Sequence, residues 1–336
     1  MRIIVDAFGG DNAPLEILKG CELAVKELGV DIIACGDERI IRDVCGKNNI
    51  SLDRIDIQHT EKIIPVECDP TEVVKSYDDC SMAIGMKMLA NGEGDAFVSA
   101  GSTGAVVVGA SLFVKRIKGI KRAALASIIP TTTGCYMLLD IGANAECRPE
   151  MLVQFGIMGS SYMEKIMGVK DPRVGIVNIG SEETKGLDLQ IIANEQMKHA
   201  PVNFIGNVEP RYLPENCCDV AVTDGFTGNV ILKLTEGLGS SLGNEIKDIF
   251  KKNFLSKVGA LFVMDGIKNF KKKMDYTEYG GAPLMGISKP VIKAHGSSNA
   301  KAFKNAIRQA KEYTQLGIIS QIEASLEELK IKSQAN

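Results

Sequence analysis

Polar residues that can bind an anion gather in glycine-rich segments, and each segment follows a short apolar run. In "TDGFTGN" at 223–229, two hydroxyls, an amide and a carboxylate follow Val220–Val222. Glycine permits close backbone approach, and the free N–H groups of such turns can bind an anion. The pattern recurs in "DAFGGDNAP" at 6–14, "AGSTGA" at 100–105, "DIGANAE" at 140–146, "NIGSEETKG" at 178–186 and "IGNVEP" at 205–210. The needs of turn geometry alone could explain one such glycine-rich segment. Six segments of this composition favour a ligand-binding crevice.

The apolar runs alternate with helical stretches, which predicts βαβ units. We expect an α/β fold in which a doubly wound, mostly parallel sheet forms an α/β/α sandwich. Ligands bind outside the carboxyl ends of the strands in such sheets, and every polar segment lies at such an end. We therefore expect the segments to share one crevice. No linker or domain boundary is evident in the 336 residues, so we predict a single domain over 1–336.

Composition excludes several classes of function. The net charge of −3 gives no global field that favours nucleic acid. Nine scattered cysteines without a C-x-x-C pair indicate reduced thiols rather than a disulfide framework. The first residues, "MRIIVDAFGG", lead directly into a predicted strand rather than a signal peptide, and no apolar run reaches the length of a membrane span. We expect a cytoplasmic protein whose membrane contact, if any, is peripheral.

The standard cofactor and metal motifs are absent from the sequence. It has no P-loop and no G-x-S-x-G, and "GLGSSLG" at 237–243 has the wrong spacing for a dinucleotide turn. The three histidines are far apart and form no H-E-x-x-H, so we expect neither a metal nor a cofactor. Among the polar residues, Lys185 is either an anion ligand or a solvated lysine, and His295 is either a ligand or a structural imidazole. Ser297 and Ser298 precede a predicted helix and are interpreted as its N-cap.

Taken together, the motifs resemble a known family. The residues that carry the resemblance are "VDAFGGDNAP", "SAGSTGA", "LLDIGAN", "PRVGIVNIG", "NFIGNVE", "VTDGFTGNVILK", "YGGAPLMG" and "PVIKAHGSSNAKAF". They run in family order from residue 3 to about 310. They resemble the bacterial phosphate acyltransferases of phospholipid synthesis (the acyl-acyl-carrier-protein:phosphate acyltransferases). The resemblance implies transfer of a fatty acyl group from acyl carrier protein to inorganic phosphate, giving acyl phosphate.

The resemblance also implies a fold similar to isopropylmalate dehydrogenases and phosphotransacetylases, a homodimer, and peripheral membrane association. It implies catalytic roles for Lys185, Asn229 and His295. The substrate-binding candidates that it implies are Asp6, Gly9, Gly10, Asp11, Ser102, Thr103, Asn144, Asn178, Asn207, Asp224 and Thr227. Two departures are evident, because Asn12 replaces the usual histidine of "GGDHAP" and Tyr77-Asp78-Asp79 replaces a common basic pair. These departures keep a catalytically silent membrane scaffold as an alternative. An oxidoreductase of related fold is a further alternative, but it would need a metal-binding aspartate cluster and a nicotinamide site, and neither is evident in the sequence.

Acyl transfer without a covalent intermediate needs little from a general base, because phosphate is already an anion. It needs the phosphate held in line and donors for the developing oxyanion, which Lys185 and Asn229 can supply. His295 can protonate the leaving thiolate. Cys147 or Cys135 could instead serve as a nucleophile, but both are interpreted as small buried hydrophobic residues.

Two segments are candidates for contacts with partners. Residues 237–274 are predicted to form an inserted amphipathic helical hairpin with a break near Ser256–Gly259 and eight lysines. A basic amphipathic helix binds an anionic membrane surface, and packing at a dimer interface is the alternative. The apolar residues that define its face are Leu238, Leu242, Ile246, Ile249, Phe250, Leu255, Val258, Leu261, Phe262, Ile267 and Phe270. "KRIKGIKR" at 115–122 carries five cations and is either a docking patch for an acidic carrier protein or a solvated helix end.

Overall fold

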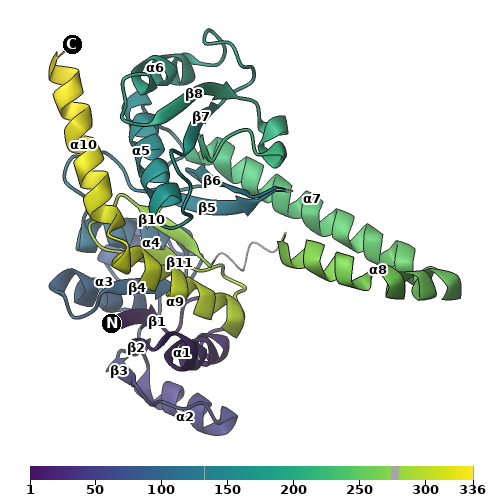
Figure 1. The fold of residues 1–336 in the computed structure, drawn as a ribbon. Coiled ribbons are helices and arrows are strands. Elements are labelled where there is room, and N and C mark those ends of the chain that lie inside the picture. The colour runs from purple at the N-terminus through teal and green to yellow at the C-terminus, as the bar shows by residue number, and fades with distance from the viewer. Residues whose placement is uncertain (132, 274–279, 336) are drawn as a thin grey trace.

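A computed structural model describes residues 1–131, 133–273 and 280–335. In this part of the chain, eleven strands form one sheet in the order β3-β2-β1-β4-β11-β10-β5-β6-β9-β7-β8 (Figure 1). The strands are β1 (Arg2–Asp6), β2 (Asp31–Gly36), β3 (Ile55–His59), β4 (Ala96–Ser99), β5 (Ala124–Pro130), β6 (Cys135–Leu139), β7 (Arg173–Val177), β8 (Asn203–Val208), β9 (Val220–Val222), β10 (Ala282–Met285) and β11 (Val291–Lys293).

Helices cover both faces of the sheet. They are α1 (Leu15–Leu28), α2 (Glu38–Asn48), α3 (Ser81–Asn91), α4 (Thr103–Gly109), α5 (Pro149–Lys165), α6 (Asp188–Met197), α7 (Gly225–Lys251), α8 (Phe254–Lys273), α9 (Ala300–Gln315) and α10 (Ile318–Ala335), with short helical turns η1 (Pro70–Val74), η2 (Ala110–Val114) and η3 (Pro210–Glu215). Side chains alternate along β1, so that Ile3 and Val5 join one hydrophobic cluster with α1, α5 and α9. Ile4 joins the other cluster, with α3, α4 and η2. This three-layer arrangement confirms the predicted α/β/α sandwich.

The sheet is mostly parallel, but its two halves run in opposite directions. Strands β3, β2, β1, β4 and β11 are parallel to one another, as are β6, β9, β7 and β8. Between them, β10 is antiparallel to β11 and β5, and β5 is antiparallel to β6. Three antiparallel steps reverse the strand direction. The mostly parallel sheet is as predicted, but the polar turns fall into two groups, one at the carboxyl ends of the strands in each half.

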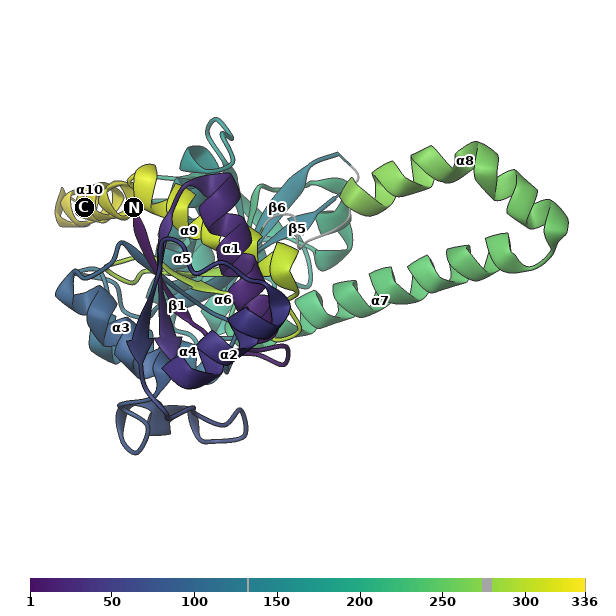
Figure 2. The same ribbon diagram turned by 90° about the horizontal axis from the view of Figure 1, so that it is seen from below.

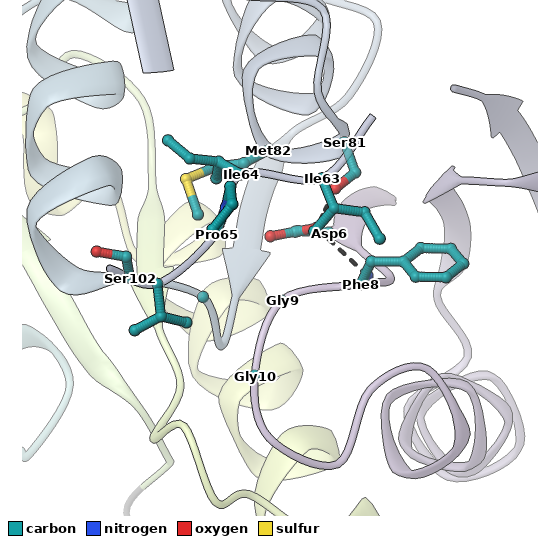
Figure 3. A pocket seen from close by; sticks show the side chains of 12 residues that line it. Asp6, Phe8, Gly9, Gly10, Ile63, Ile64, Pro65, Ser81, Met82 and Ser102 are labelled. Carbon is teal, nitrogen blue, oxygen red and sulfur yellow. Dashed lines mark hydrogen bonds between the residues drawn. The ribbon is translucent and has the colours of Figure 1, made fainter. Parts of the chain in front are cut away.

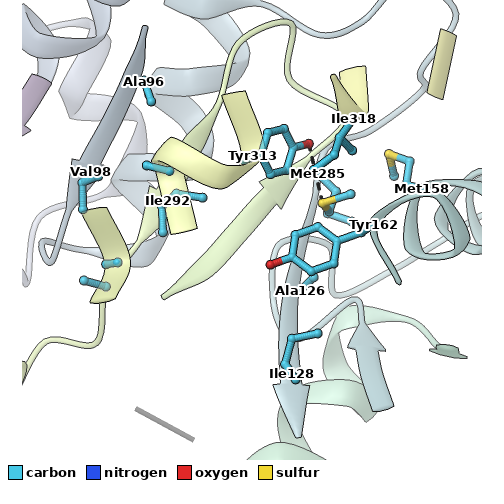
Figure 4. Close-up of a cluster of buried hydrophobic side chains, with 14 of the residues drawn as sticks. Ala96, Val98, Ala126, Ile128, Met158, Tyr162, Met285, Ile292, Tyr313 and Ile318 are labelled. Carbon is cyan, nitrogen blue, oxygen red and sulfur yellow. Dashed lines mark hydrogen bonds between the residues drawn. The ribbon is translucent and has the colours of Figure 1, made fainter. Parts of the chain in front are cut away.

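The C-terminal elements join the two halves. After α8 the chain returns through β10 and β11 to β4, and α9 then packs on α1. Figure 4 shows the junction, where Tyr162 of α5, Tyr313 of α9 and Met285 of β10 pack together. The Tyr162 hydroxyl accepts a 2.7 Å hydrogen bond from Gln309 Nε2, and the Tyr313 hydroxyl lies 3.7 Å from Met285 Sδ. Apolar packing with satisfied hydroxyls thus couples the halves.

Helices α7 and α8 form a hairpin that projects from the body of the protein (Figure 2). Helix α7 begins at Gly225 and runs without interruption past residue 237, so the hairpin continues a helix of the body. The predicted break at Ser256–Gly259 was wrong, because the helices are separated at Lys252 and Asn253. Asn253 Oδ1 accepts the N–H of Ser256 at 2.8 Å, which caps the start of α8. The side chains of Leu261 and Phe270, and residue Met274, lie outside the described residues.

The prediction that Ser297 and Ser298 form the N-cap of the helix that follows them was also wrong. Asn299 is the N-cap of α9, and its side chain accepts the N–H of Ala302 at 2.9 Å. Ser297 instead lies beside the imidazole of His295, and Ser298 is buried. The two serines therefore belong to the loop after β11 rather than to the helix.

Candidate functional site

The first group of polar turns lies at the carboxyl ends of β1, β4 and β11, and we call it the β4 cluster. It comprises Asp6, residues 9–12, Ser81, residues 99–103 and residues 293–298. Asp6 is buried, and its two carboxyl oxygens accept the hydroxyls of Ser81 and Ser99, each at 2.7 Å. Burial raises the pKa of Asp6, and these hydroxyls act against that rise. Asp6 therefore fixes β1 to α3 and β4 and has little capacity left for a ligand.

The turn after β1 is pressed against the other two strand ends. A Cβ on Gly9 would lie 2.4 Å from Asp6 Oδ2, and Gly10 has a φ of +103° that disfavours any side chain. The N–H of Asp11 donates to the carbonyl of Gly296 at 2.9 Å. Asn12 Nδ2 lies 3.1 Å from the carbonyl of Ser297 and also bonds that of Ser298. Asn12, which replaces the histidine usual in the family, therefore connects this turn to the loop after β11.

A cavity of about 160 Å³ opens beside this turn. Figure 3 shows that Asp6 and Ser81 lie at one wall, Phe8 flanks them, and Ser102 lies across the space. The apolar part of the lining is Phe8, Ile63, Ile64, Pro65, Val66 and Met82. Gly9, Gly10 and Gly101 bring the backbone to its edge. The cavity thus combines an apolar wall with hydroxyl and backbone donors, as small-molecule sites do. Thr103 is the first residue of α4, next to Ser102.

His295 is exposed at the rim of the β4 cluster. Its Nδ1 lies 2.8 Å from the Ser297 hydroxyl and accepts the N–H of Ser297 at 3.2 Å. When the imidazole is neutral, this contact leaves the proton on Nε2. Nε2 is then the nitrogen that can donate to a ligand.

The second group lies at the carboxyl ends of β6, β9, β7 and β8, and we call it the β9 cluster. It comprises residues 140–144, 178–186, Asn207 and residues 223–229. Its organising residue is the fully buried Asp140. Asp140 Oδ1 accepts the N–H groups of Leu125, Gly142 and Ala143, and Oδ2 accepts both the N–H and the side-chain amide of Asn144. Burial raises the pKa of Asp140, and the bonds from Ala143 and Asn144 oppose it.

Helix α7 begins directly on this turn. Asp224 is its N-cap and accepts the N–H and hydroxyl of Thr227, each at 2.8 Å. The N–H of Gly225 donates to the carbonyl of Asn144 at 2.7 Å. A Cβ on Gly228 would lie 1.9 Å from the carbonyl oxygen of Asp140. The glycines of "TDGFTGN" are therefore required by backbone contact with residues 140–144, and Asp224 and Thr227 pair with each other.

Asn229, at the end of this segment, keeps an available polar side chain. It is half-buried, and its amide nitrogen lies 3.5 Å from the position of a Cβ on Gly142. Its side chain makes no hydrogen bond within the described residues. Asn144 is different, because its amide is engaged by Asp140 and by the carbonyl of Ala123 at 2.7 Å. Asn229 thus presents both donor and acceptor groups beside a glycine turn.

The loop after β7 carries Lys185. Asn178 Nδ2 donates to the carbonyl of Lys185, and Asn207 Nδ2 donates to the carbonyl of Glu182, each at 2.9 Å. The Lys185 side chain is exposed and makes no ion pair in the part of the chain that is described. The two asparagines therefore hold the loop, and the lysine is left for a ligand. Asn207 lies inside β8 rather than in the turn that the sequence suggested.

The predicted catalytic residues are divided between the two clusters. Lys185 and Asn229 lie in the β9 cluster with Asn144, Asn178, Asn207, Asp224 and Thr227. His295 lies in the β4 cluster with Asp6, Gly9, Gly10, Asp11, Ser102 and Thr103. No hydrogen bond or ion pair links the clusters within residues 1–131, 133–273 and 280–335.

Two buried charged residues lie at these sites, Asp140 and Lys293. Sequence reasoning named Lys293 only as one of several polar residues before a predicted helix, and it gave Asp140 no role. Lys293 ends β11 after the apolar residues Val291 and Ile292. A single lysine in an otherwise apolar strand is a signal that the sequence does contain. Asp140 had no such signal, because an aspartate after a strand is ordinary turn chemistry.

The described part of the chain shows neither a set of metal ligands nor an activated thiol at Cys147. It contains no group of three or more His, Cys, Asp or Glu side chains placed to hold a metal ion. Cys147 Sγ lies 3.8 Å from the carbonyl of Asn144, and burial raises its pKa to about 12. A thiol with such a pKa is almost entirely protonated at neutral pH and is a poor nucleophile.

Comparison with known proteins bears on this geometry. A family model described as "Fatty acid synthesis protein" matches residues 1–321. A phosphate acyltransferase from Alkaliphilus oremlandii is 46% identical over 329 residues, which cover 98% of each chain. A phosphate acyltransferase from Clostridium botulinum is 44% identical over 327 residues, covering 97% of this chain and 98% of that one.

Solved structures share the fold at low sequence identity. A phosphotransacetylase from Streptococcus pyogenes has a TM-score of 0.61 and 17% identity, covering 96% of this chain and 94% of that one. A putative 4-hydroxythreonine-4-phosphate dehydrogenase from Salmonella typhimurium has a TM-score of 0.54 and 11% identity, covering 93% and 98%. These likenesses concern the fold alone. From the family model and the full-length relatives, the chain belongs to the phosphate acyltransferase family and is an acyltransferase.

Proposed function

We propose that this acyltransferase moves a fatty acyl group from acyl-acyl carrier protein to inorganic phosphate. The acyl carbon–sulfur bond breaks, a carbon–oxygen bond to phosphate forms, and the phosphate proton leaves with the carrier thiol. The products are an acyl phosphate and free carrier protein, and no cofactor takes part. The observation that carries the proposal is a pair of polar side chains without a partner among the described residues, Asn229 and Lys185, at the carboxyl ends of neighbouring strands β9 and β7.

The chemistry follows from the properties of these groups. Attack on the thioester carbonyl develops an oxyanion, which the Asn229 amide N–H and the Lys185 ammonium can stabilise. Phosphate needs no general base, because it is already an anion at neutral pH. We propose that His295 Nε2 donates to phosphate or to the leaving sulfur when the substrates bridge the two clusters. The raised pKa of Cys147 favours direct attack over an acyl-cysteine intermediate.

The product suits a supply role in phospholipid synthesis. An acyl phosphate is a mixed anhydride, and we propose that it serves the acylation of glycerol 3-phosphate. A reactive amphiphile of this kind is best released beside a membrane. The described chain contains no helix long and apolar enough to span a bilayer. We therefore propose peripheral association of a cytoplasmic homodimer with the inner face of the cell membrane through the α7–α8 hairpin.

The assay of this function uses purified protein, acyl-acyl carrier protein and phosphate. We expect acyl phosphate, trapped as the hydroxamate, and free carrier thiol in equal amounts. Thiol without acyl phosphate would indicate a hydrolase. Absence of both products at every chain length would contradict the proposal and favour a scaffold.

We further propose that residues 115–122 dock the acidic carrier protein. The five cationic side chains of this segment are exposed and make no ion pair within the described residues. Gln154 bonds to both Lys121 and Gly119, which fixes the segment to α5. The segment ends at Ala123, whose carbonyl binds the Asn144 amide of the β9 cluster. A carrier protein bound to residues 115–122 would therefore lie next to the β9 cluster, which contains Asn229.

Reversing two charges in this segment tests the docking surface. In Lys118→Glu/Lys121→Glu we expect the KM for acyl-acyl carrier protein to rise about tenfold, because complementary charge aids encounter. The KM for a small acyl thioester without carrier protein should not change. Lys165→Glu/Lys170→Glu, on another exposed surface, is the matched control. An unaltered carrier KM in the first variant would rule out this surface.

A further inference from the structure

Lys293 is a buried lysine at the end of β11, with 7% of its surface exposed. Its Nζ donates to the carbonyl of Ala100, at 3.3 Å, and to the carbonyl of Ala294. The third N–H of the ammonium has no acceptor, and no carboxylate lies within ion-pair distance, among the described residues. A buried ammonium is normally paired, because removing the charge from water is costly.

The nearby carboxylates do not supply that pairing. Asp6 is engaged by the hydroxyls of Ser81 and Ser99. Asp11 lies on the exposed side of the turn, where its carboxylate approaches Gly296. Both carboxylates act on Lys293 through space and favour its charged form, whereas burial lowers its pKa to about 8. Lys293 is thus mostly protonated at neutral pH and lacks a contact anion.

The Lys293 ammonium lies near other hydrogen-bond donors that have no acceptor among the described residues. Ala100, whose carbonyl it binds, leads into Gly101 and Ser102 at the edge of the 160 Å³ cavity. Gly10 lies against Ala100 and the carbonyl of Gly296, each 2.9 Å from where its Cβ would be. The N–H groups of Gly10 and Ser102 make no hydrogen bond within the part of the chain that is described. Gly10 and Ser102, whose N–H groups are unbonded among the described residues, thus line the cavity. The Lys293 ammonium lies beside this lining, on the carbonyl of Ala100, the residue before Gly101.

We propose that Lys293 is the cation that binds inorganic phosphate, and that the β4 cluster is the phosphate subsite. This assignment rests on the proposed acyl transfer to phosphate, and it places the acyl thioester at the β9 cluster with Asn229 and Lys185. Phosphate oxygens accept from the ammonium and from the N–H groups of Gly10 and Ser102. In this way the ammonium gains the contact anion that the described residues do not provide.

The test compares Lys293→Met with Lys289→Met. Lys289, at the start of the same β-hairpin arm, also donates to a backbone carbonyl, that of Leu89 at 2.7 Å, but lies away from the cluster. In Lys293→Met we expect the KM for phosphate to rise roughly 10- to 100-fold, the range for a lost charged hydrogen bond. The KM for the acyl carrier substrate should stay within about twofold. An unchanged phosphate KM in a folded Lys293→Met protein would overturn the assignment.

A second measurement uses the wild-type protein and needs no variant to fold. Phosphate binding is followed by calorimetry at pH 8.5, without acyl substrate, in two buffers of different ionisation enthalpy. A group with a pKa of about 8 is mostly deprotonated there, so an anion that needs its charged form draws in roughly 0.7 proton per phosphate. The other titratable groups of the cluster are Asp6, Asp11 and His295. Phosphate binding without proton uptake would contradict the role of Lys293.

The two proposals fail in distinguishable ways. If the wild-type protein forms no acyl phosphate, the proposed function fails, and calorimetry still decides whether Lys293 binds the anion. If the wild-type protein is active but Lys293→Met keeps its phosphate KM, the function stands and the subsite assignment fails.

Discussion

Replacing Asn229 by alanine is expected to lower kcat roughly 100- to 1,000-fold without unfolding the protein. Loss of one oxyanion donor has effects of this size in enzymes that transfer acyl groups. The fold should tolerate the change, because the Asn229 side chain makes no hydrogen bond within the described residues and lies beside the open turn at Gly142. The measurement is steady-state kcat together with the thermal unfolding midpoint.

Asn244→Ala is the matched control for this change. Asn244 is an exposed amide on the same helix, α7, and is expected to have no effect on kcat. Asn229→Asp should be at least as damaging as Asn229→Ala, since a carboxylate repels the developing oxyanion. Full activity in Asn229→Ala would show that "TDGFTGN" is a capped turn and nothing more.

Placing charge at the tip of the α7–α8 hairpin is expected to release the protein from membranes. Phe254 and Leu255 follow the turn between the helices, and 78% and 79% of their surfaces are exposed. Insertion of each large apolar side chain is worth about 1.5–3 kcal/mol. Phe254→Glu/Leu255→Glu should therefore weaken binding to anionic vesicles at least about 100-fold. Co-sedimentation with vesicles measures this.

The alternative that the α7–α8 hairpin packs at a dimer interface is tested with the same Phe254→Glu/Leu255→Glu variant. Sedimentation equilibrium should show an unchanged oligomeric state if the tip meets lipid. Loss of self-association with intact vesicle binding would assign the tip to subunit contact and defeat the membrane role. Ile331→Glu, at an exposed apolar residue of α10, is the control, and it should bind vesicles as the wild-type protein does.

Much of the fold could be predicted from the sequence. Runs such as Val174–Val177 and Val220–Val222 are β-branched and end in glycine-rich turns, which fixed their identity as strands. The topology could not be predicted, because the reversal depends on β5 and β10 pairing antiparallel with their neighbours. Such pairings depend on tertiary contacts that local patterns do not encode. That residues 1–336 fold as one domain stays a prediction.

Exposed or half-buried polar residues such as Lys185 and Asn229 could be named as candidates from the sequence, and their roles stay predictions. The candidate site was not predictable where a residue's importance comes from burial. Asp140 and Lys293 are ordinary in sequence, and the structure alone shows that both are enclosed. The helix cap at Asn299 and the break at Asn253 show the same limit, since several neighbouring polar residues could each have served as the cap.

The central claim is direct transfer from the thioester to phosphate, and phosphate dependence of thiol release tests it most directly. Enzyme in excess over acyl-acyl carrier protein is mixed with and without phosphate, and carrier thiol is measured in a single turnover. We predict that thiol appears only with phosphate and that an equal amount of acyl phosphate forms with it. A stoichiometric burst of thiol without phosphate would contradict the account, because it would show that the enzyme itself, through Cys147 or another nucleophile, takes up the acyl group.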